Sequence, residues 1–440
     1  MQAQRPLLGD VHARARPFEP EVVPRPADRP LRIAWLGPRP EEVGGVPSMA
    51  RQMILGLADQ PVDLELFLDS PRTPFLDELA QRSNVRVNAY TARWSWRRWY
   101  SSTRLTALAS GTAARVHTGE RLAQRLAARH AEQPFDVVYR LSQIELFALR
   151  RLRRQLPPIV LHPEVHAEGE RRHHWRERSL ALRCEPLPAF AVSQAYLGYR
   201  AGVQRRDLRS VARLVAPSAR FADLLAGDYG FPRRRIDVLP NVIDLDRFHP
   251  APAPPPPSPV RLLFVSRMSV RKGVEQIVEL SHRLHDLAGQ VRIDCLGGAS
   301  LFSNYSRLLD DLNPGVACRL EALAPGDLAG LYRGAHGLLQ PSWYEPYALT
   351  VGEALASGLP VIVTDEVGAG EGVDSRVCRV HAAGDIDGLE REVRRLVAEV
   401  QAGWAPELRD VARRHAEEHL SRDRFARDLV GLLSELRVAA

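Results

Sequence analysis

A proline-rich decapeptide, PAPAPPPPSP (250–259), divides this sequence into two long stretches with the same alternation of elements. Proline has no backbone N–H and a fixed φ, so a segment this rich in proline enters neither a helix interior nor a central strand. Such a segment forms an extended, semi-rigid spacer. The chain has 440 residues, and we therefore expect one domain on each side of the spacer.

Short apolar segments predict strands on both sides of the spacer. The expected strands are 32–37, 62–68, 85–90, 136–140 and 158–162 in the first half, and 260–266, 291–297, 336–341 and 359–364 in the second. A helix is expected from the Gly-Gly loop at 44–45 to about residue 57. Further helices are expected at about 273–286, 302–312, 326–334, 351–357, 386–402 and 405–436.

Strands that alternate with helices of ten to fifteen residues predict βαβ units and a parallel sheet. The expected fold class is therefore α/β, with two Rossmann-like, doubly wound domains facing a central cleft. Folds of this kind bind ligands at the carboxyl ends of their strands. The last helical stretch is expected to cross back to the first domain. The expected divisions are a flexible arm rich in Pro and Arg (1–30), a first domain (31–249), the linker (250–259), a second domain (260–404) and C-terminal helices (405–440).

The formal net charge of +7 is unevenly distributed, because residues 1–250 carry +12 and residues 251–440 carry −5. We therefore expect an anionic partner at the first half only, and a membrane surface, nucleic acid or a phosphorylated substrate would each fit. The four cysteines form no C-x-x-C pair and are typical of buried thiols in a cytosolic protein. No apolar run is long enough for a transmembrane helix, and the N-terminus lacks the apolar region of a secretory signal.

Two carboxylates stand eight residues apart in SWYEPYALTVGEALASGLPVIVTD (342–365). Glu345 falls in a loop and Glu353 in the first turn of a helix, where backbone N–H groups and the helix dipole favour an anion. A loop carboxylate can also meet sugar hydroxyls. A purely structural alternative exists for Glu353, because Thr350-x-x-Glu353 fits a capping box.

A second segment, FVSRMSVRKGVEQIVEL (264–280), predicts a strand, a basic loop and a helix that begins near Gly273. Arg267 and Lys272 flank the loop, and two cations beside helix N–H groups can hold a diphosphate without a metal. A solvated basic loop is the structural alternative. Of the 60 basic residues, 59 are arginine and Lys272 is the single lysine.

Together these segments resemble the retaining GT-B glycosyltransferases of glycosyltransferase family 4 (glycosyl transferases group 1). The resemblance rests on E-P-Y-A-L-T-V-G-E (345–353) and S-R-M-S-V-R-K-G (266–273), and it extends to L-P-N-V-I-D-L-D-R-F-H-P (239–250), G-G-V (44–46) and E-V-H (164–166). It implies a GT-B fold whose first domain binds the acceptor and whose second domain binds a nucleotide-sugar. It also implies an enzyme that needs no cofactor, because the nucleotide-sugar is a co-substrate.

The resemblance implies a role for each matching residue. Arg267 and Lys272 would hold the donor diphosphate, Glu345 would lie against the transferred sugar, and Glu353 would bond the donor ribose. Backbone amides of Tyr347, Ala348 and Leu349 would point at the sugar or phosphate. Gly44 and Gly45 would let the opposite wall of the cleft approach the donor closely. His166 would lie over the cleft near the reacting centre. Ala348 stands where glycine is commonest in the family.

The segment TARWSWRRWYSSTR (91–104) interleaves aromatic residues with arginines. This composition suits an anionic membrane surface or a lipid-linked acceptor, whereas packing of the tryptophans into the domain is the structural alternative. No nucleic-acid-binding module accompanies it. We therefore expect a metal-independent hexosyltransferase in the cytoplasm or on the inner face of a membrane, active on a glycan or lipid-linked acceptor and using a UDP-sugar. The alternatives are a nucleotide-sugar epimerase, a phosphorylase or a catalytically silent donor-binding subunit.

Overall fold

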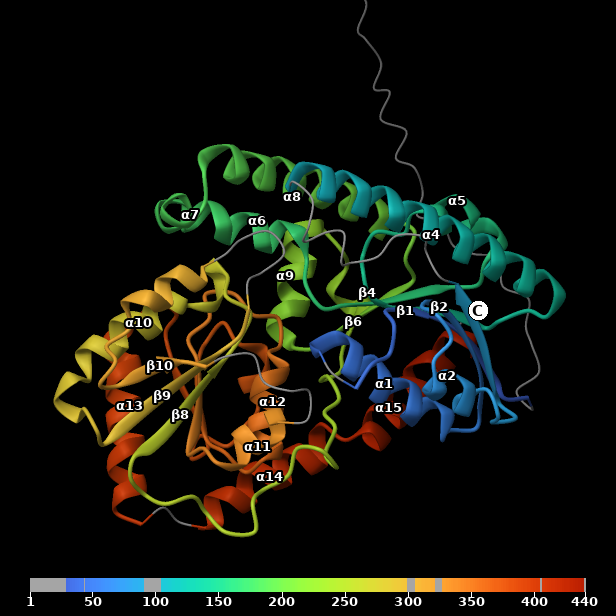
Figure 1. Cartoon of the computed structure of the whole chain (residues 1–440). Helices are drawn as coiled ribbons and strands as arrows, with labels where there is room; N and C mark the ends of the chain where they lie inside the picture. Colours follow the sequence, from blue (N-terminus) through green and yellow to red (C-terminus); the bar gives the residue numbers. More distant parts are fainter. Residues whose placement is uncertain are drawn as a thin grey trace, which may run out of the picture.

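The computed structural model describes residues 29–42, 44–90, 104–298, 305–320, 327–403 and 406–438. Two separate parallel sheets lie in the two halves of the molecule (Figure 1). The first has the strand order β3-β2-β1-β4-β5-β6-β7, and the second has the order β10-β9-β8-β11-β12-β13. The expected class of two doubly wound α/β domains is confirmed.

The first sheet is buried on both faces, as a parallel sheet requires. Along β1, Ile33 and Trp35 join one hydrophobic cluster, whereas Ala34 and Leu36 join another on the opposite face. The seven strands are β1 Leu31–Gly37, β2 Val62–Asp69, β3 Val85–Tyr90, β4 Val137–Ser142, β5 Ile159–Pro163, β6 Arg213–Ala216 and β7 Ile236–Val238.

Helices cover both faces of this sheet. Apolar side chains of α1, α2 and α15 fill one cluster, and those of α4, α8 and α9 contribute to the other. The helices of this half are α1 Gly45–Ala58, α2 Pro74–Leu79, α4 Arg104–Glu132, α5 Ala148–Leu152, α6 Ala167–Arg176, α7 Arg178–Cys184, α8 Leu187–Leu208 and α9 Ala219–Tyr229.

The second sheet is built in the same way. Leu262 and Phe264 of β8 face a cluster that includes α10 and α13, and Leu263 and Val265 face another that includes α11, α12 and α14. Its elements are β8 Val260–Val265, α10 Val274–Arg283, β9 Val291–Leu296, β10 Ala317–Arg319, α11 Asp327–Arg333, β11 Gly337–Gln340, α12 Leu349–Ala356, β12 Val361–Thr364, β13 Cys378–His381 and α13 Ile386–Gln401.

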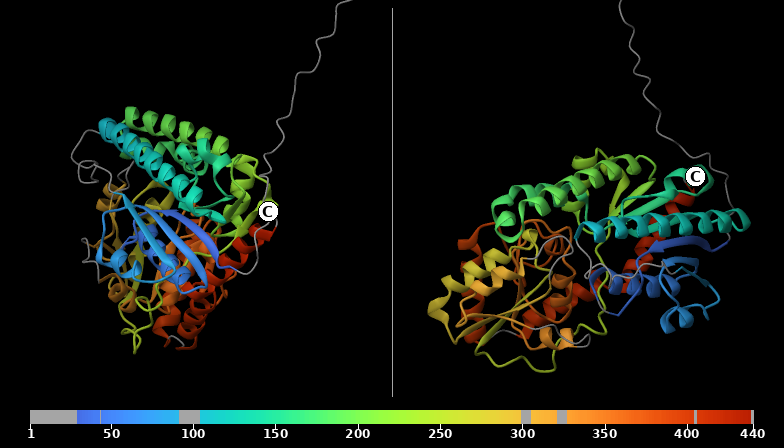
Figure 2. Two further views of the ribbon diagram at one scale, coloured as in Figure 1. Left: turned by 90° about the vertical axis from the view of Figure 1, so that its right-hand side faces the viewer. Right: turned by 45° about the horizontal axis from the view of Figure 1, so that its top comes forward.

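The C-terminal stretch forms two helices, α14 Pro406–His419 and α15 Arg422–Val438, that belong to different halves. Ala412 and Ala416 of α14 lie in the same cluster as α12, whereas Phe425 and Leu429 of α15 lie in the same cluster as α1. Figures 1 and 2 show these red helices running from the second half to the first. The expected crossing is confirmed, with a break between the helices that the sequence pattern did not predict.

The proline segment separates the two sheets as expected, since residues 239–259 form neither helix nor strand. Arg409 and Arg413 of α14 hold the region in place by donating to the carbonyl oxygens of Ala251 and Phe248, at 2.6 and 2.8 Å. The start of the spacer therefore lies against α14. The sheets fall within the expected domains 31–249 and 260–404, whose exact bounds stay a prediction.

Two expectations lie largely outside the described residues. The arm 1–30 is described only at Arg29 and Pro30, and the aromatic-basic segment 91–104 only at Arg104, the first residue of α4. Arg29 forms an ion pair with Asp136 at 2.6 Å. No helix in the described ranges is both long and apolar enough to cross a membrane.

The crossing of α15 over α1 gives the first prediction. A Cβ at Gly56 would lie 2.7 Å from the Arg422 carbonyl oxygen, whereas a Cβ at Gly431 of α15 would meet no atom within 4 Å. We expect Gly56→Ala to lower the free energy of unfolding by about 1–3 kcal/mol through this clash. Gly431→Ala, the matched control, should raise it by about 0.5–1 kcal/mol because alanine is the better helix former. Urea unfolding measures both, and equal effects would contradict the close packing.

Candidate functional site

A carboxylate and two cations meet where β8 and β11 end. Glu345, in the loop after β11, forms an ion pair with Lys272 and accepts a hydrogen bond from Arg271 Nη1 at 2.9 Å. Lys272 and Arg271 belong to a short 3₁₀ turn, Val270–Lys272, that follows β8. Because β8 and β11 are adjacent parallel strands, their carboxyl ends bring the two loops together. The structure thus joins Glu345 and Lys272, as expected, and adds Arg271.

Burial governs the electrostatics of this cluster. The side chains of Lys272 and Glu345 are 13% and 8% exposed. Burial lowers the pKa of Lys272 well below its usual value, and the nearby cations of Arg271 and Arg267 lower it further, whereas the Glu170 carboxylate raises it. Arg267 is exposed and does not share this contact. The cluster therefore gathers basic side chains whose present ion-pair partners are Glu345 and Glu170.

The basic turn is held close to the neighbouring loop by a glycine. Gly273 has φ +69°, and a Cβ there would lie 1.9 Å from the Pro341 carbonyl oxygen. Only glycine allows both this φ and this approach. The close approach fixes Lys272 beside the loop that carries Glu345. Arg271 could have been recognised in the sequence only as one more arginine in the basic turn.

The helix α12 begins directly after a strained residue. Ala348 has φ +79° and ψ +87°, a conformation that favours glycine, and it precedes Leu349, the first residue of α12. This explains why glycine is the usual residue at this place in the family. Tyr347 is buried and its hydroxyl lies 3.4 Å from the Asn241 carbonyl oxygen, in the first half of the chain. The backbone of residues 347–349 thus lies at the seam between the domains.

Glu353 does not cap its own helix. The N-cap of α12 is Ala348, which places Thr350 inside the helix, so the capping-box alternative is wrong. The Tyr332 hydroxyl donates to Glu353 Oε2 at 2.9 Å. Burial raises the pKa of Glu353 to about 7, against the opposing effects of this hydrogen bond and of Arg247. A half-buried carboxyl that does not cap its helix is available to a ligand.

Glu353 lines a shallow hollow that both domains form, with about 310 Å³ of empty space when the part open to solvent is counted. From the first half come Met49 and Gln52 of α1, and from the second comes Leu349. A Cβ at Gly45 would lie 3.5 Å from Leu349 Cδ1, and Gly44 caps α1 with φ +101°. The structure therefore brings the glycine loop to the same seam as α12, as the resemblance implied.

His166 is deeply buried at the seam. It follows β5, has no exposed surface, and its Nδ1 lies 2.6 Å from the Tyr344 hydroxyl of the second domain. Its Nε2 lies 2.6 Å from Asp228 Oδ2, and Arg172 pairs with the same carboxylate. Both ring nitrogens are thus engaged, and a catalytic role for His166 stays a prediction that requires these bonds to open. Tyr344 and Asp228 had no signal in the sequence.

Further contacts hold the domains together. Ser218 Oγ donates to the Pro346 carbonyl oxygen at 2.7 Å, and the Glu371 carboxylate accepts the N–H groups of Ala219 and Arg220 at 2.7 and 2.9 Å. These N–H groups begin α9, where a carboxylate is favourable. Among the residues that the structure describes, no group of three or more His, Cys, Asp or Glu side chains is arranged for a metal ion.

Two parallel α/β domains, whose strand ends meet at a seam with a carboxylate–cation cluster, define the GT-B class of glycosyltransferases. Residues 43–247 match the family model described as Glycosyltransferase Family 4, and residues 259–399 match the one described as Glycosyl transferases group 1. The chain belongs to these glycosyltransferase families. The resemblance inferred from the motifs is thereby confirmed.

Curated relatives and solved structures agree with this class. The chain is 32% identical over 176 residues to a D-inositol 3-phosphate glycosyltransferase of Paenarthrobacter aurescens, covering 37% of this chain and 43% of the relative. It is 28% identical over 174 residues to a mannosylfructose-phosphate synthase of Agrobacterium fabrum, covering 36% of this chain and 38% of the relative. The chain thus spans less than half the length of these curated relatives.

Two solved structures share the fold across nearly the whole chain. The sucrose-phosphate synthase of Thermosynechococcus elongatus superposes with a TM-score of 0.67 at 17% identity, covering 93% of this chain and all of that one. HepE of Anabaena in complex with UDP-glucose superposes with a TM-score of 0.59 at 16% identity, covering 92% of this chain and all of that one. At these identities the likeness concerns the fold.

The raised pKa of Glu353 gives the second prediction. A carboxyl with a folded pKa near 7 and an ordinary value of 4.5 favours folding in its protonated form, so its contribution is lost as pH rises through this window. Glu353→Gln lacks this loss and keeps an acceptor for Tyr332. We expect the variant to gain about 2 kcal/mol of stability relative to the parent between pH 5 and pH 8. Urea unfolding at both pH values tests this, with Glu279→Gln on the surface of α10 as the control that shows no such gain.

Proposed function

We propose that this protein transfers a glycosyl group, with retention of anomeric configuration, from a nucleotide-diphosphate sugar to an acceptor hydroxyl. The observation that carries the proposal is the contact of Glu345 with Lys272 and Arg271 beside the start of α12. Two cations at the end of adjacent strands match the charge of a diphosphate. Membership of the two glycosyltransferase families supports the same reaction.

The cluster assigns a part to each side chain. The donor diphosphate takes the place of Glu345 as counter-ion of Lys272 and Arg271, with Arg267 at the exposed edge. The displaced carboxylate of Glu345 then faces the sugar. During the reaction the acceptor hydroxyl oxygen bonds to the anomeric carbon, and the bond from that carbon to the phosphate oxygen breaks. The diphosphate leaves with the electron pair, and its departing oxygen takes the proton of the acceptor hydroxyl. The cations stabilise the negative charge that develops on the leaving group.

The rest of the donor extends along the seam. Glu353, in the hollow shared by α12 and the glycine loop, bonds the donor ribose, and amides of residues 347–349 meet the sugar or phosphate. UDP is the proposed nucleotide, in keeping with the UDP-glucose bound to HepE. The proposed acceptor is a glycan or lipid-linked molecule of surface polysaccharide, lipopolysaccharide or glycolipid synthesis. The proposed place of action is the cytoplasm, at the inner face of a membrane.

The alternatives differ in what they need from the site. A phosphorylase with pyridoxal phosphate needs a Schiff-base lysine. Lys272 is the single lysine of the chain, and it is engaged with Glu345. An epimerase would release nucleotide without an acceptor, and a silent subunit would bind donor without turnover. Incubation with a panel of nucleotide-sugars, scored for acceptor-dependent release of nucleotide diphosphate, separates these functions.

Replacement of the single lysine gives the third prediction. Lys272 lies between Glu345, Arg271 and a tight glycine turn, which leaves room for a compact ammonium but not for a second planar guanidinium. We expect Lys272→Arg to lower kcat/KM by roughly ten- to a hundredfold, close to the effect of Lys272→Ala, because a charged hydrogen bond is lost. Arg395→Lys on the exposed face of α13 is the control, with the reverse exchange of cations away from the site. Parent-like kinetics of Lys272→Arg would contradict a shape-selected phosphate ligand.

The fourth prediction concerns metal ions. If protein cations replace a metal at the diphosphate, activity with and without excess EDTA should agree within a factor of about two, since protein cations alone can provide the charge stabilisation. The measurement is the initial rate of nucleotide diphosphate release. Loss of activity on chelation, restored by added Mg²⁺ or Mn²⁺, would disprove the assignment of the diphosphate to Lys272 and Arg271.

A further inference from the structure

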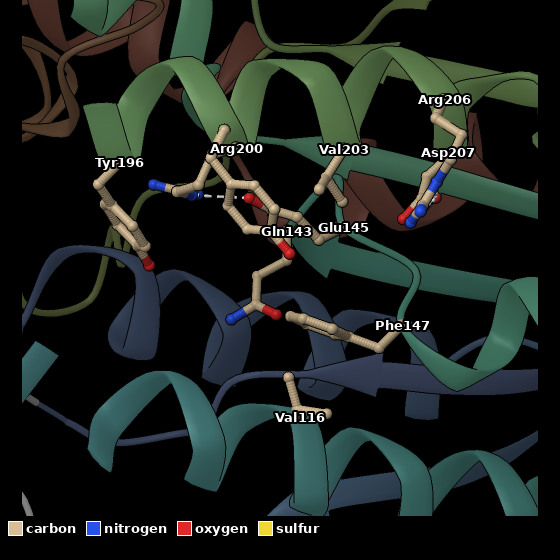
Figure 3. A pocket seen from close by; sticks show the side chains of 10 residues that line it. Val116, Gln143, Glu145, Phe147, Tyr196, Arg200, Val203, Arg206 and Asp207 are labelled. Atoms are coloured by element: carbon tan, nitrogen blue, oxygen red, sulfur yellow. Dashed lines mark hydrogen bonds and ion pairs between the residues drawn. The ribbon is translucent and has the colours of Figure 1, made fainter. Parts of the chain in front are cut away.

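A second pocket lies within the first domain, away from Glu345. It has about 630 Å³ of empty space, counting the part open to solvent, and lies between α4 and α8 above the loop that follows β4 (Figure 3). Its walls are formed by Val116 of α4, by residues of the loop and by one face of α8: Gln143, Glu145, Phe147, Tyr196, Tyr199, Arg200, Val203, Arg206 and Asp207. The enclosed part of this space is about 110 Å³, which is smaller than the usual pocket for a whole drug-sized ligand.

The pocket occupies the place in the fold where ligands bind. β1 and β4 are neighbours in the sheet, and the strand order reverses between them. Ligands of doubly wound folds bind at such a switch point, outside the carboxyl ends of the strands. The loop after β1 carries Gly44, which lies at the seam between the domains where the donor is proposed to bind. The loop after β4 carries Gln143 and Phe147 of the pocket. The two sites therefore share one edge of the sheet.

Backbone strain marks the same loop. In the described part of the chain three residues other than glycine have positive φ: Ser142 at +77°, Phe147 at +50° and Ala348 at +79°. Ala348 belongs to the donor seam, and the other two bracket the loop 143–146. Strained residues persist where the surrounding structure holds them, and they concentrate at binding sites. This strain is evidence for a binding site, and this evidence does not depend on the volume of the pocket.

The charged groups of the pocket neutralise one another. Arg200 Nε and Gln204 Nε2 donate to Glu145 Oε1 at 2.7 and 3.0 Å. Asp207 Oδ1 accepts from Arg206 Nε at 3.0 Å, and its Oδ2 accepts the Leu146 N–H at 2.9 Å. An uncharged ligand leaves these pairs intact, whereas an anionic one would have to compete with the two carboxylates for the arginines.

Apolar surfaces fill the remaining walls. Figure 3 shows Val116 of α4 and Val203 of α8 on opposite sides, with Phe147 projecting between the helices. Tyr199 lines the pocket and is also 67% exposed, and Leu187 at the start of the same helix is 65% exposed. An apolar guest would therefore be covered inside and would emerge beside the exposed ring of Tyr199. An amphiphile, with a hydrocarbon part and a polar part, has this character.

We propose that this pocket binds the hydrocarbon part of an amphiphilic acceptor, whose polar end reaches the donor seam along the shared sheet edge. The proposal rests on glycosyl transfer as the proposed function and adds the chemical class of the acceptor. It commits to an uncharged apolar moiety and excludes a phosphate group in the pocket. The paired state of Arg200 and Arg206 is the reason for this exclusion.

The first test measures binding with an uncharged apolar probe, N-phenyl-1-naphthylamine. The parent protein should give a saturable increase in fluorescence that decan-1-ol reverses and methyl glucoside and glucose 6-phosphate do not. Val203→Trp and Val116→Trp, which fill the pocket from opposite walls, should each weaken binding at least tenfold. Gly202→Trp is the matched control, because a Cβ there meets no atom within 4 Å, and it should bind as the parent does. Non-saturable binding, equal binding by all variants, or displacement by either sugar would overturn the proposal.

The second test separates the pocket from the proposed function. Nucleotide diphosphate release is compared with decyl and methyl glycosides of glucose, galactose and mannose, while UDP affinity is measured for every variant. We expect faster release with the decyl glycoside and at least a tenfold loss of this preference in Val203→Trp, at unchanged UDP affinity. Equal rates with both chain lengths would overturn the proposal for the acceptor. Absence of release with any donor and acceptor would instead contradict the proposed function, and it would remove the acceptor role with it.

Discussion

Burial of both faces of two parallel sheets is the constraint on which this structure depends. A parallel sheet leaves all carboxyl strand ends at one edge, so the loops that follow the strands gather there. In the second domain this brings Glu345, after β11, into contact with Lys272 and Arg271, after β8. In the first domain it places the glycine loop and His166 opposite them. The site is thus a direct consequence of the way the sheets are covered.

The ion pairs of the seam have a consequence for ligand binding. In this structure Glu345 neutralises Lys272 and Arg271, so a donor diphosphate has to replace an existing counter-ion. This exchange keeps Lys272 and Arg271 paired with an anion at every stage, which avoids the large cost of an isolated cation in the interior. It also couples the position of Glu345 to the presence of the donor. The contacts of Ser218 with Pro346 and of Glu371 with α9 hold the two domains together during the exchange.

The central strands, α1 and the helices α10 to α13 could be predicted from the sequence because their apolar patterns are regular and buried, whereas the longest helices, α4 and α8, were not predicted. Four strands were missed: β6, β7, β10 and β13. Each has only three or four residues, and three of them lie at an edge of a sheet, so few apolar positions distinguish them from loops. The break between α14 and α15 was missed for a different reason. It depends on which domain each helix packs against, and that is a tertiary contact.

For the site, the sequence by itself determined the class of chemistry, because Glu345, Glu353, Arg267 and Lys272 occur at fixed spacings in motifs of known families. The tertiary structure alone decided the partners. Arg271 rather than Arg267 contacts Glu345, Tyr332 rather than the helix terminus bonds Glu353, and both nitrogens of His166 are engaged. The pocket between α4 and α8 was also outside the reach of the sequence. The spacing of residues in the sequence determines only which side chains are close along the chain. These contacts join residues more than twenty positions apart, and only the packing of the two sheets brings them together.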